Sequence, residues 1–338
     1  MNTDRASSSR LIRSPLSRLG LAIAVVLSVL AIGAPALAPH APYEQLDPAA
    51  GRFLPPLSSR VVLPLREGGW LLADSARVTD SGVVVQRLGR TETLPLDRFT
   101  GISEDGGVSR QFFLLGTDKY GRDLWSRLLY GARVSLLIGL LAAGLSLTLG
   151  IAVGGVAALA GGWIDGLLMR LVDGLLMFPR LFLVLVIAAM FDIDLLAVIL
   201  VLGGTSWMAA SRLVRAEILS LRGRDFVVAA RGIGLHPVRI FWRHLLPNAL
   251  PPVLIDTTLR IGDLILIEAA LSFLGFGVQP PIPSWGNMVA DGASNLTTAW
   301  WVAAFPGIAI CLAVVAFNLL GDGLRDSLDP RLDETLPC

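Results

Sequence analysis

Four ionisable residues lie inside one apolar run of the sequence, Leu250–Leu274. They are Asp256, Arg260, Asp263 and Glu268. The first three are spaced by four and three residues, so they share one face of a helix, where opposite charges can pair. At about 1.5 Å per residue, Arg260 falls near the middle of a membrane-spanning helix. Ionisable groups at that depth are costly and usually face a bundle interior or a wet cavity. They predict either the lining of a transport pathway or a structural ion-pair cluster, and the sequence leaves both open.

The sequence offers no set of residues for covalent chemistry. The zinc pattern H-E-x-x-H is missing, and His40, His236 and His244 fall in predicted loops on opposite faces. Lys119 is the only lysine and follows Asp118, so a phosphate-binding G-x-x-x-x-G-K-[ST] loop cannot form. We therefore expect no catalytic residue, no metal site and no cofactor in this chain. If ATP drives the process, partner subunits bind the ATP and magnesium.

The composition is that of a protein embedded in a lipid bilayer. Hydrophobic residues make up 54% of the 338 residues and charged residues 16%, against about 25% charged residues in ordinary soluble domains. The arginines are spread over several loops and the net charge is +1, so no basic face for nucleic acid is expected. Cys311 and Cys338 predict no disulfide framework.

Six apolar runs are long enough to cross a bilayer, which takes about 20 residues per helix. They are Leu19–Ala38, Val134–Leu159, Leu167–Met190, Leu195–Leu219, Leu250–Leu274 and a last run from near Trp301 to near Leu320. Arginines next to the first, fourth and sixth runs place the tails 1–18 and 325–338 in the cytoplasm. A cleaved signal peptide ending at Ala38 is the alternative for the first run. We favour a retained span because Pro39 is a poor residue to follow a cleavage site.

Three features inside these runs predict how the helices pack. Gly150 and Gly154 are four residues apart, which lets a neighbouring helix approach closely. Arg170 and Asp173 are three apart on one helix face and are expected to pair. Pro179 is expected to kink the third span.

Residues 39–115 interrupt the apolar pattern with Pro, Gly, Ser and charges of both signs. Short strands are expected near Arg60–Leu65 and Gly82–Leu88. We predict a small, partly β insert outside the cytoplasm, which elaborates packing rather than binds the transported solute.

Two further segments flank the membrane in this interpretation. Residues 116–133 predict an amphipathic helix at the membrane interface, with Trp125 and Tyr130 as anchors. The loop 277–295 has three prolines that forbid a continuous helix, and Ser284 can cap a short helix that begins at Trp285. Such a loop can contact a delivery protein.

The most basic connection is Asp225–Pro247, between the fourth and fifth spans. Short arginine-rich connections lie on the cytoplasmic side. Phe226–Ile233 can form two helical turns, and Gly234 can adopt the left-handed conformation that ends a helix. Pro237 suits the first turn of a second short helix, and Pro247 marks where the chain leaves it. Two short helices lying flat on the cytoplasmic face would form a docking surface.

This segment also carries the motif of a known family. Val228-Ala229-Ala230, then Gly234, then Leu246-Pro247, resembles the Glu-Ala-Ala…Gly…Leu-Pro loop of permeases in binding-protein-dependent ABC importers. The stretch G-T-D-x-x-G-R-D-x-x-S-R from Gly116, the stretch L-S-F-L-G from Leu271 and the ending L-L-G-D-G-L-R-D-S-L-D-P-R-L resemble the dipeptide, oligopeptide and nickel branch. Val228 stands where the family has glutamate, so we expect apolar fit to contribute more to docking than a salt bridge.

The resemblance implies an all-α polytopic membrane protein of six transmembrane helices, with a five-helix permease core at 134–324 and an added N-terminal span. The implied role is half of the translocation pathway for di- or oligopeptides or a similar small solute, in a subunit that is not an enzyme. The implied partners are a second related permease subunit, two cytoplasmic ATPase subunits and an extracytoplasmic solute-binding protein, at the bacterial inner membrane. The motif residues expected to couple to the ATPase are Asp225, Val228, Ala229, Ala230, Gly234, Leu246 and Pro247. The sequence does not distinguish a dipeptide from a longer peptide, a nickel chelate or glutathione.

A secondary transporter coupled to protons through Asp256, Asp263 or Glu268 is the alternative. Transporters of that class have inverted repeats and broken helices. The sequence shows no internal repeat, and such a transporter needs no docking helices on its inner face.

Overall fold

The structure is a computed structural model of the chain, and it describes residues 15–79, 82–100, 109–191 and 194–328. The chain divides into two compact units. Unit 1 comprises Met1–Leu27, Ser135–Leu271 and Ile310–Cys338, and unit 2 comprises Ser28–Val134 and Ser272–Ala309. Residues 1–14 and 329–338, which hold most of the predicted cytoplasmic tails, lie outside the described residues.

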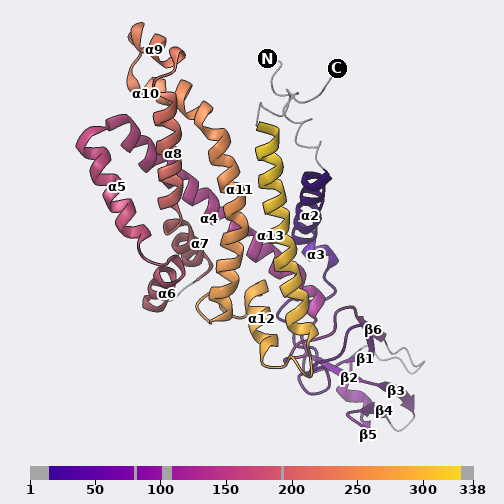
Figure 1. Cartoon of the computed structure of the whole chain (residues 1–338). Coiled ribbons are helices and arrows are strands. Elements are labelled where there is room, and N and C mark those ends of the chain that lie inside the picture. Colours follow the sequence, from indigo (N-terminus) through magenta and orange to yellow (C-terminus); the bar gives the residue numbers. More distant parts are fainter. Residues whose placement is uncertain (1–14, 80–81, 101–108, 192–193, 329–338) are drawn as a thin grey trace, which may run out of the picture. The chain divides into compact units, whose positions relative to one another are not determined.

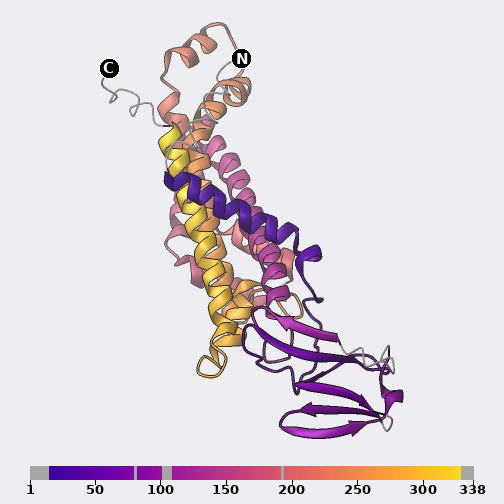
Figure 2. The same ribbon diagram turned by 90° about the vertical axis from the view of Figure 1, so that its right-hand side faces the viewer.

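Unit 1 is built from helices (Figure 1). Complete helices in this unit are α5 (Gly162–Leu176), α6 (Arg180–Met190), α7 (Leu195–Gly204), α8 (Trp207–Leu221), α9 (Asp225–Gly232) and α10 (Pro237–Ile240). Parts of α2 (Pro15–Ile32), α4 (Leu124–Ala160), α11 (Leu246–Phe273) and α13 (Trp301–Leu328) also belong to it. Figures 1 and 2 show α9 and α10 beyond the ends of α8 and α11.

The predicted spans are only partly continuous helices. Among the described residues, α2, α4 and α13 are long and apolar enough to cross a membrane singly. The pairs α5–α6 and α7–α8 pass the same test as bent units, with bends of 83° and 41°. The predicted third and fourth spans are therefore broken. Pro179 lies at the first break, and it ends the helix rather than kinks it because proline lacks an N–H and clashes with the preceding turn.

Salt bridges connect α5 to α8, which runs beside it. Arg215 donates to Asp165 from Nε at 2.5 Å and from Nη2 at 2.6 Å. Asp173 pairs with Arg212 at 3.5 Å, so the predicted pairing of Asp173 within its own helix is wrong. The arginine that reaches Asp173 comes from the neighbouring helix, which the spacing along one helix does not reveal.

The close approach predicted for Gly150 and Gly154 is made by α8. A β-carbon on Gly150 would lie 2.6 Å from the Ala210 side chain, and one on Gly154 would clash with the carbonyl oxygen of Ser211. Both glycines therefore allow backbone contact between α4 and α8.

Unit 2 contains two antiparallel three-stranded sheets, with strand orders β2-β1-β6 and β3-β4-β5 (Figure 2). The strands are β1 (Ser58–Pro64), β2 (Trp70–Ala73), β3 (Ser75–Thr79), β4 (Gly82–Arg87), β5 (Arg90–Leu94) and β6 (Ser109–Phe113). The residues predicted to form strands lie in or around β1 and β4. Val61 and Val83 share a core with Phe99, because alternate side chains of each sheet point to one face.

The remainder of unit 2 includes α3 (Ala34–Leu37), α12 (Trp285–Ala293) and a 3₁₀ turn, Leu96–Arg98. Ser284 caps α12 as predicted, since its Oγ accepts from the Asn287 N–H and the Asn287 side chain accepts from the Ser284 N–H.

The prediction of an amphipathic interfacial helix over residues 116–133 is wrong. Residues 117 and 123 form an isolated β-bridge around a turn, and α4 begins only at Leu124 and continues to Ala160. Arg122, Asp123 and Arg127 are buried instead of facing an interface. Their burial is possible because oppositely charged and hydrogen-bonding partners surround them.

Candidate coupling surface and charged clusters

The segment predicted to dock onto the ATPase forms two short helices joined by a left-handed turn. α9 begins at Asp225 and ends at Gly232, and Gly234 has φ +77°. A β-carbon on Gly234 would meet nothing within 4 Å, so the backbone conformation, not space, requires glycine here. Pro237 occupies the first turn of α10, where its missing N–H is not needed.

The motif residues of this segment divide between two environments. Asp225, Val228 and Ala229 are exposed, with Val228 56% exposed. Ala230 is 5% exposed and packs in a core with Val227 and Leu245. The outer face of α9, rather than Ala230, is therefore available to a partner.

Pro247 does not mark an exit from the second short helix. α10 continues into a π-helical segment, Phe241–Leu245, and this segment continues into α11. Leu246 is buried in the same core as Ala230, and Pro247 is the second residue of α11, directly after the π-helical segment. The predicted end of the docking segment is therefore wrong, because helix runs through it without a break.

An exposed surface of mixed apolar and basic character covers α9, α10 and the π-helical segment. We call it the coupling surface. Its exposed apolar residues are Phe226, Val228, Ile233, Val238 and Trp242. Its exposed arginines are Arg224, Arg231, Arg239 and Arg243. Exposed apolar groups rimmed by charges are typical of protein interaction sites.

The coupling surface is anchored to α4 through Phe241. The ring of Phe241 is buried, and a β-carbon on Gly155 would lie 2.8 Å from its Cζ. A cavity of about 390 Å³ lies beside this contact and is lined by α4 and by Val238, Trp242 and Leu246. π-Helical turns occur frequently at functional sites.

The four ionisable residues of α11 do not form one cluster. Asp256 and Arg260 pair as predicted, with Arg260 donating from Nε at 2.5 Å and from Nη2 at 3.2 Å. Asp263 is exposed. Glu268 is fully buried and accepts from Ser135 Oγ at 3.1 Å, so it belongs to the contact between α4 and α11.

The sequence did not reveal a further charged residue near Arg260 and Asp263 of α11. Arg180, the first residue of α6, lies within electrostatic range of Arg260 and Asp263. Its Nη2 donates to Ser206 Oγ at 2.6 Å. Its position directly after Pro179 could have indicated its role. A proline interrupts a helix, so the residue after it can begin a new helix in another direction and point its side chain elsewhere.

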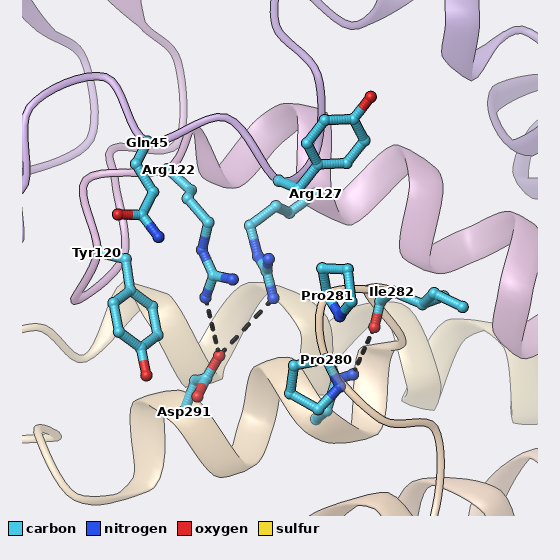
Figure 3. Close-up of a pocket in the computed structure, with 10 residues that line it drawn as sticks. Gln45, Tyr120, Arg122, Arg127, Pro280, Pro281, Ile282 and Asp291 are labelled. Atoms are coloured by element: carbon cyan, nitrogen blue, oxygen red, sulfur yellow. Dashed lines mark hydrogen bonds and ion pairs between the residues drawn. The ribbon is translucent and has the colours of Figure 1, made fainter. Parts of the chain in front are cut away.

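A second charged cluster lies in unit 2, between the chain before α4 and helix α12 (Figure 3). Arg122 donates to Asp118 from Nε at 2.6 Å, and Arg127 pairs with the same carboxylate at 3.5 Å. Asp291 pairs with Lys119 at 2.9 Å, with Arg122 at 3.3 Å and with Arg127 at 3.7 Å. Three cations thus face two carboxylates.

Lys119 in this cluster and Asp123 beside it have shifted pKa values. The hydrogen bond to Asp291 raises the pKa of Lys119, which stays charged. Burial raises the pKa of Asp123, while hydrogen bonds from Ser126 act in the opposite direction. Ser126 donates to Asp123 from its backbone N at 2.8 Å and from Oγ at 2.6 Å.

The second cluster forms one wall of a pocket of about 420 Å³ (Figure 3). Arg122, Arg127 and Asp291 line the pocket together with the exposed side chains of Tyr43, Tyr120 and Ile282. Tyrosine and arginine, which both line this pocket, are among the residue types enriched in energetically dominant protein contacts.

Comparisons with known proteins agree with this architecture. The family described as binding-protein-dependent transport system inner membrane component matches residues 146–334. The N-terminal TM domain of oligopeptide transport permease C matches residues 7–56. The helical fold is similar to the inward-facing MetNI methionine ABC transporter, with a TM-score of 0.50 at 20% identity, over 60% of this chain and 96% of that chain.

The chain matches two curated relatives over about three quarters of each relative's length. A putative peptide transport system permease protein of Brucella suis is 50% identical over 222 residues, 65% of this chain and 74% of the relative. The di/tripeptide transport system permease protein DppC of Pseudomonas aeruginosa is 45% identical over 228 residues, 68% of this chain and 75% of the relative.

These matches decide between the classes that the sequence left open. The proton-coupled secondary transporter is not supported, although the broken helices expected of that class are present in α5–α6 and α7–α8. The family consists of membrane components that work with a separate solute-binding protein. Because its family model matches more than half of the residues, the chain belongs to the inner-membrane components of binding-protein-dependent transport systems, as a permease subunit of an ABC importer and not as an enzyme.

Proposed function

We propose that the chain forms half of the translocation pathway of a bacterial importer for di- or oligopeptides. The observation that carries this proposal is the family match combined with relatives named for peptide and di/tripeptide transport at 50% and 45% identity. A second related permease subunit would supply the other half of the pathway. Two cytoplasmic ATPase subunits would bind the ATP and magnesium.

The coupling surface supports docking to those ATPase subunits. Its exposed side chains include five apolar residues and four arginines beside the acid Asp225, so a partner groove needs apolar walls and a mainly acidic rim. Val228 at the position of the family's glutamate replaces one charged contact by apolar fit, so salt should weaken docking only through the arginines at the rim.

The test of the proposed function is uptake by the reconstituted complex. The chain is purified with its partner subunits, placed in liposomes and supplied with the loaded solute-binding protein. We expect ATP-dependent accumulation of a labelled dipeptide, and no vanadate-sensitive ATP hydrolysis by the chain alone. Accumulation of a nickel chelate or glutathione without any peptide would refute the assignment of peptide as the solute.

We predict six membrane spans with both ends in the cytoplasm. Three single helices and two bent pairs among the described residues supply five spans, and α11 would supply the sixth despite its charged row. A reporter fused after Cys338 should behave as cytoplasmic. A reporter inserted between Gly68 and Gly69, where a β-carbon meets nothing within 4 Å, should behave as external. Cytoplasmic activity at both sites would contradict this topology.

In this topology unit 2 faces the outside, and we infer that its pocket receives the solute-binding protein. The excess of cations over carboxylates in the pocket wall suits an acidic side chain of that protein. Tyr43, which is 64% exposed, and Ile282 form the accessible rim.

A charge placed at the rim tests this docking site. Ile282→Glu should repel an acidic partner side chain and raise the concentration of loaded binding protein needed for half-maximal uptake about tenfold, which corresponds to about 1.4 kcal/mol. Leu296→Glu is the matched control, since Leu296 is also an exposed apolar residue of unit 2 but does not line the pocket. Equal effects of the two variants would rule out the pocket as the docking site.

A further inference from the structure

Arg180 connects the two broken helix pairs of unit 1. It begins α6 immediately after the 83° break from α5. Ser206, which accepts its hydrogen bond, lies at the 41° break between α7 and α8. In secondary transporters, a different class, charged groups of the solute bind at such discontinuities because the ends of the half-helices direct polar groups at the ligand. Figure 1 shows α6 and α7 next to one another in this region.

The guanidinium of Arg180 is incompletely paired. Its Nε is buried and has no hydrogen-bond partner among the described residues. Its one side-chain partner, Ser206, is neutral, and the Ser206 hydroxyl itself donates to the Leu202 carbonyl oxygen. Within the described part of the chain no carboxylate lies within ion-pair distance of Arg180. The guanidinium therefore keeps a positive charge and an unused N–H donor.

The neighbouring charges differ from Arg180 in this respect. Arg260 is held by both oxygens of Asp256, so its charge is balanced inside α11. Asp263 is exposed and acts on Arg180 only at longer range. Arg180 is thus the cation of this row that retains capacity for a carboxylate from outside the chain.

We propose that Arg180 binds the C-terminal carboxylate of the peptide as it passes through the pathway, an inference that rests on the proposed function. A guanidinium presents two parallel N–H groups that match the two oxygens of a carboxylate. Nε and the adjacent Nη2 form such a pair once the bond to Ser206 is exchanged for the ligand. The solute class this site favours is a peptide with a free C terminus.

The test compares a dipeptide with its C-terminal amide in the reconstituted complex. Each is supplied with the solute-binding protein at concentrations that saturate it, and initial uptake rates are normalised to the loaded protein. We expect the wild-type complex to transport the free acid about tenfold faster than the amide, the range of one charge-assisted hydrogen bond. Arg180→Gln should lower the rate of the free acid to that of the amide and leave the amide unchanged, and Arg180→Lys should restore part of the difference.

Ser206→Ala separates binding from a purely structural role. It removes the internal partner of Arg180 but keeps the guanidinium, so the acid-to-amide ratio should stay at the wild-type value. If Arg180→Gln lowers the rates of both peptides equally, or if Ser206→Ala abolishes the ratio, Arg180 only holds the helix breaks together and the inference fails. A wild-type complex that transports both peptides at the same rate overturns the inference alone. A complex that transports neither peptide overturns the proposed function with it.

Discussion

Replacing Ala229 with tryptophan should abolish uptake while leaving the amount of permease in the membrane unchanged. Ala229 lies on the exposed face of α9, beside the apolar residues of the coupling surface. An indole at this point prevents close contact with the ATPase subunit. Loss of a central contact costs about 2 kcal/mol or more, which corresponds to about a 30-fold weaker association. Copurification of the ATPase subunits and ATP-dependent uptake are the measurements.

The adjacent alanine provides the matched control. Ala230 is buried in the chain's own core, so Ala230→Trp should disturb folding instead of docking, with an overpacking cost above the about 1–3 kcal/mol that added methylene groups cause. The expected signature is a lower membrane level and a lower melting temperature, neither of which Ala229→Trp should produce. If Ala229→Trp keeps wild-type copurification and uptake, the coupling surface is not the ATPase contact.

Replacing Arg127 with methionine should destabilise unit 2 strongly. The Arg127 side chain is 3% exposed and faces Asp118, which is 1% exposed, as well as Asp291. Methionine fills similar space but leaves those carboxylates with fewer partners in a buried site, and breaking a buried pair costs about 3–5 kcal/mol. Thermal unfolding of the detergent-solubilised protein, followed by near-ultraviolet circular dichroism, measures the loss.

Arg133→Met on the same helix is the comparison for Arg127→Met. Arg133 is exposed and stacks over Tyr130 at 5.9 Å, so its removal should change stability by about 0.5 kcal/mol or less. Similar melting temperatures for the two variants would show that the cluster around Asp118 and Asp291 contributes little.

The sequence predicted the elements whose information is local. The left-handed Gly234, the Pro237 helix start and the Ser284 cap each depend on a few neighbouring residues, and each is present. The pairing of Asp256 with Arg260 also follows from their spacing along one helix.

The contacts that the sequence did not reveal join residues far apart in the chain. Arg122 appeared suited to a membrane interface, but its hydrogen bond to Asp291 spans 169 residues of sequence and draws it into the interior. Asp173 likewise pairs with another helix. The break at Ser206 has no proline, but it directly follows Gly203 and Gly204, and sharp kinks also occur at glycine and serine.

The π-helical segment fixes the rotational phase of the docking helices about the axis of α11. Each residue of an α-helix turns the chain by about 100°, and a π turn holds its extra residue by bonding to the fifth instead of the fourth residue. Phe241–Leu245 therefore acts as a one-residue offset between α10 and α11. A homologue that lost one residue here would present the same side chains about 100° further round the axis, towards a different neighbour. Length in this segment, independent of residue type, is thus a determinant of which partner the permease can engage.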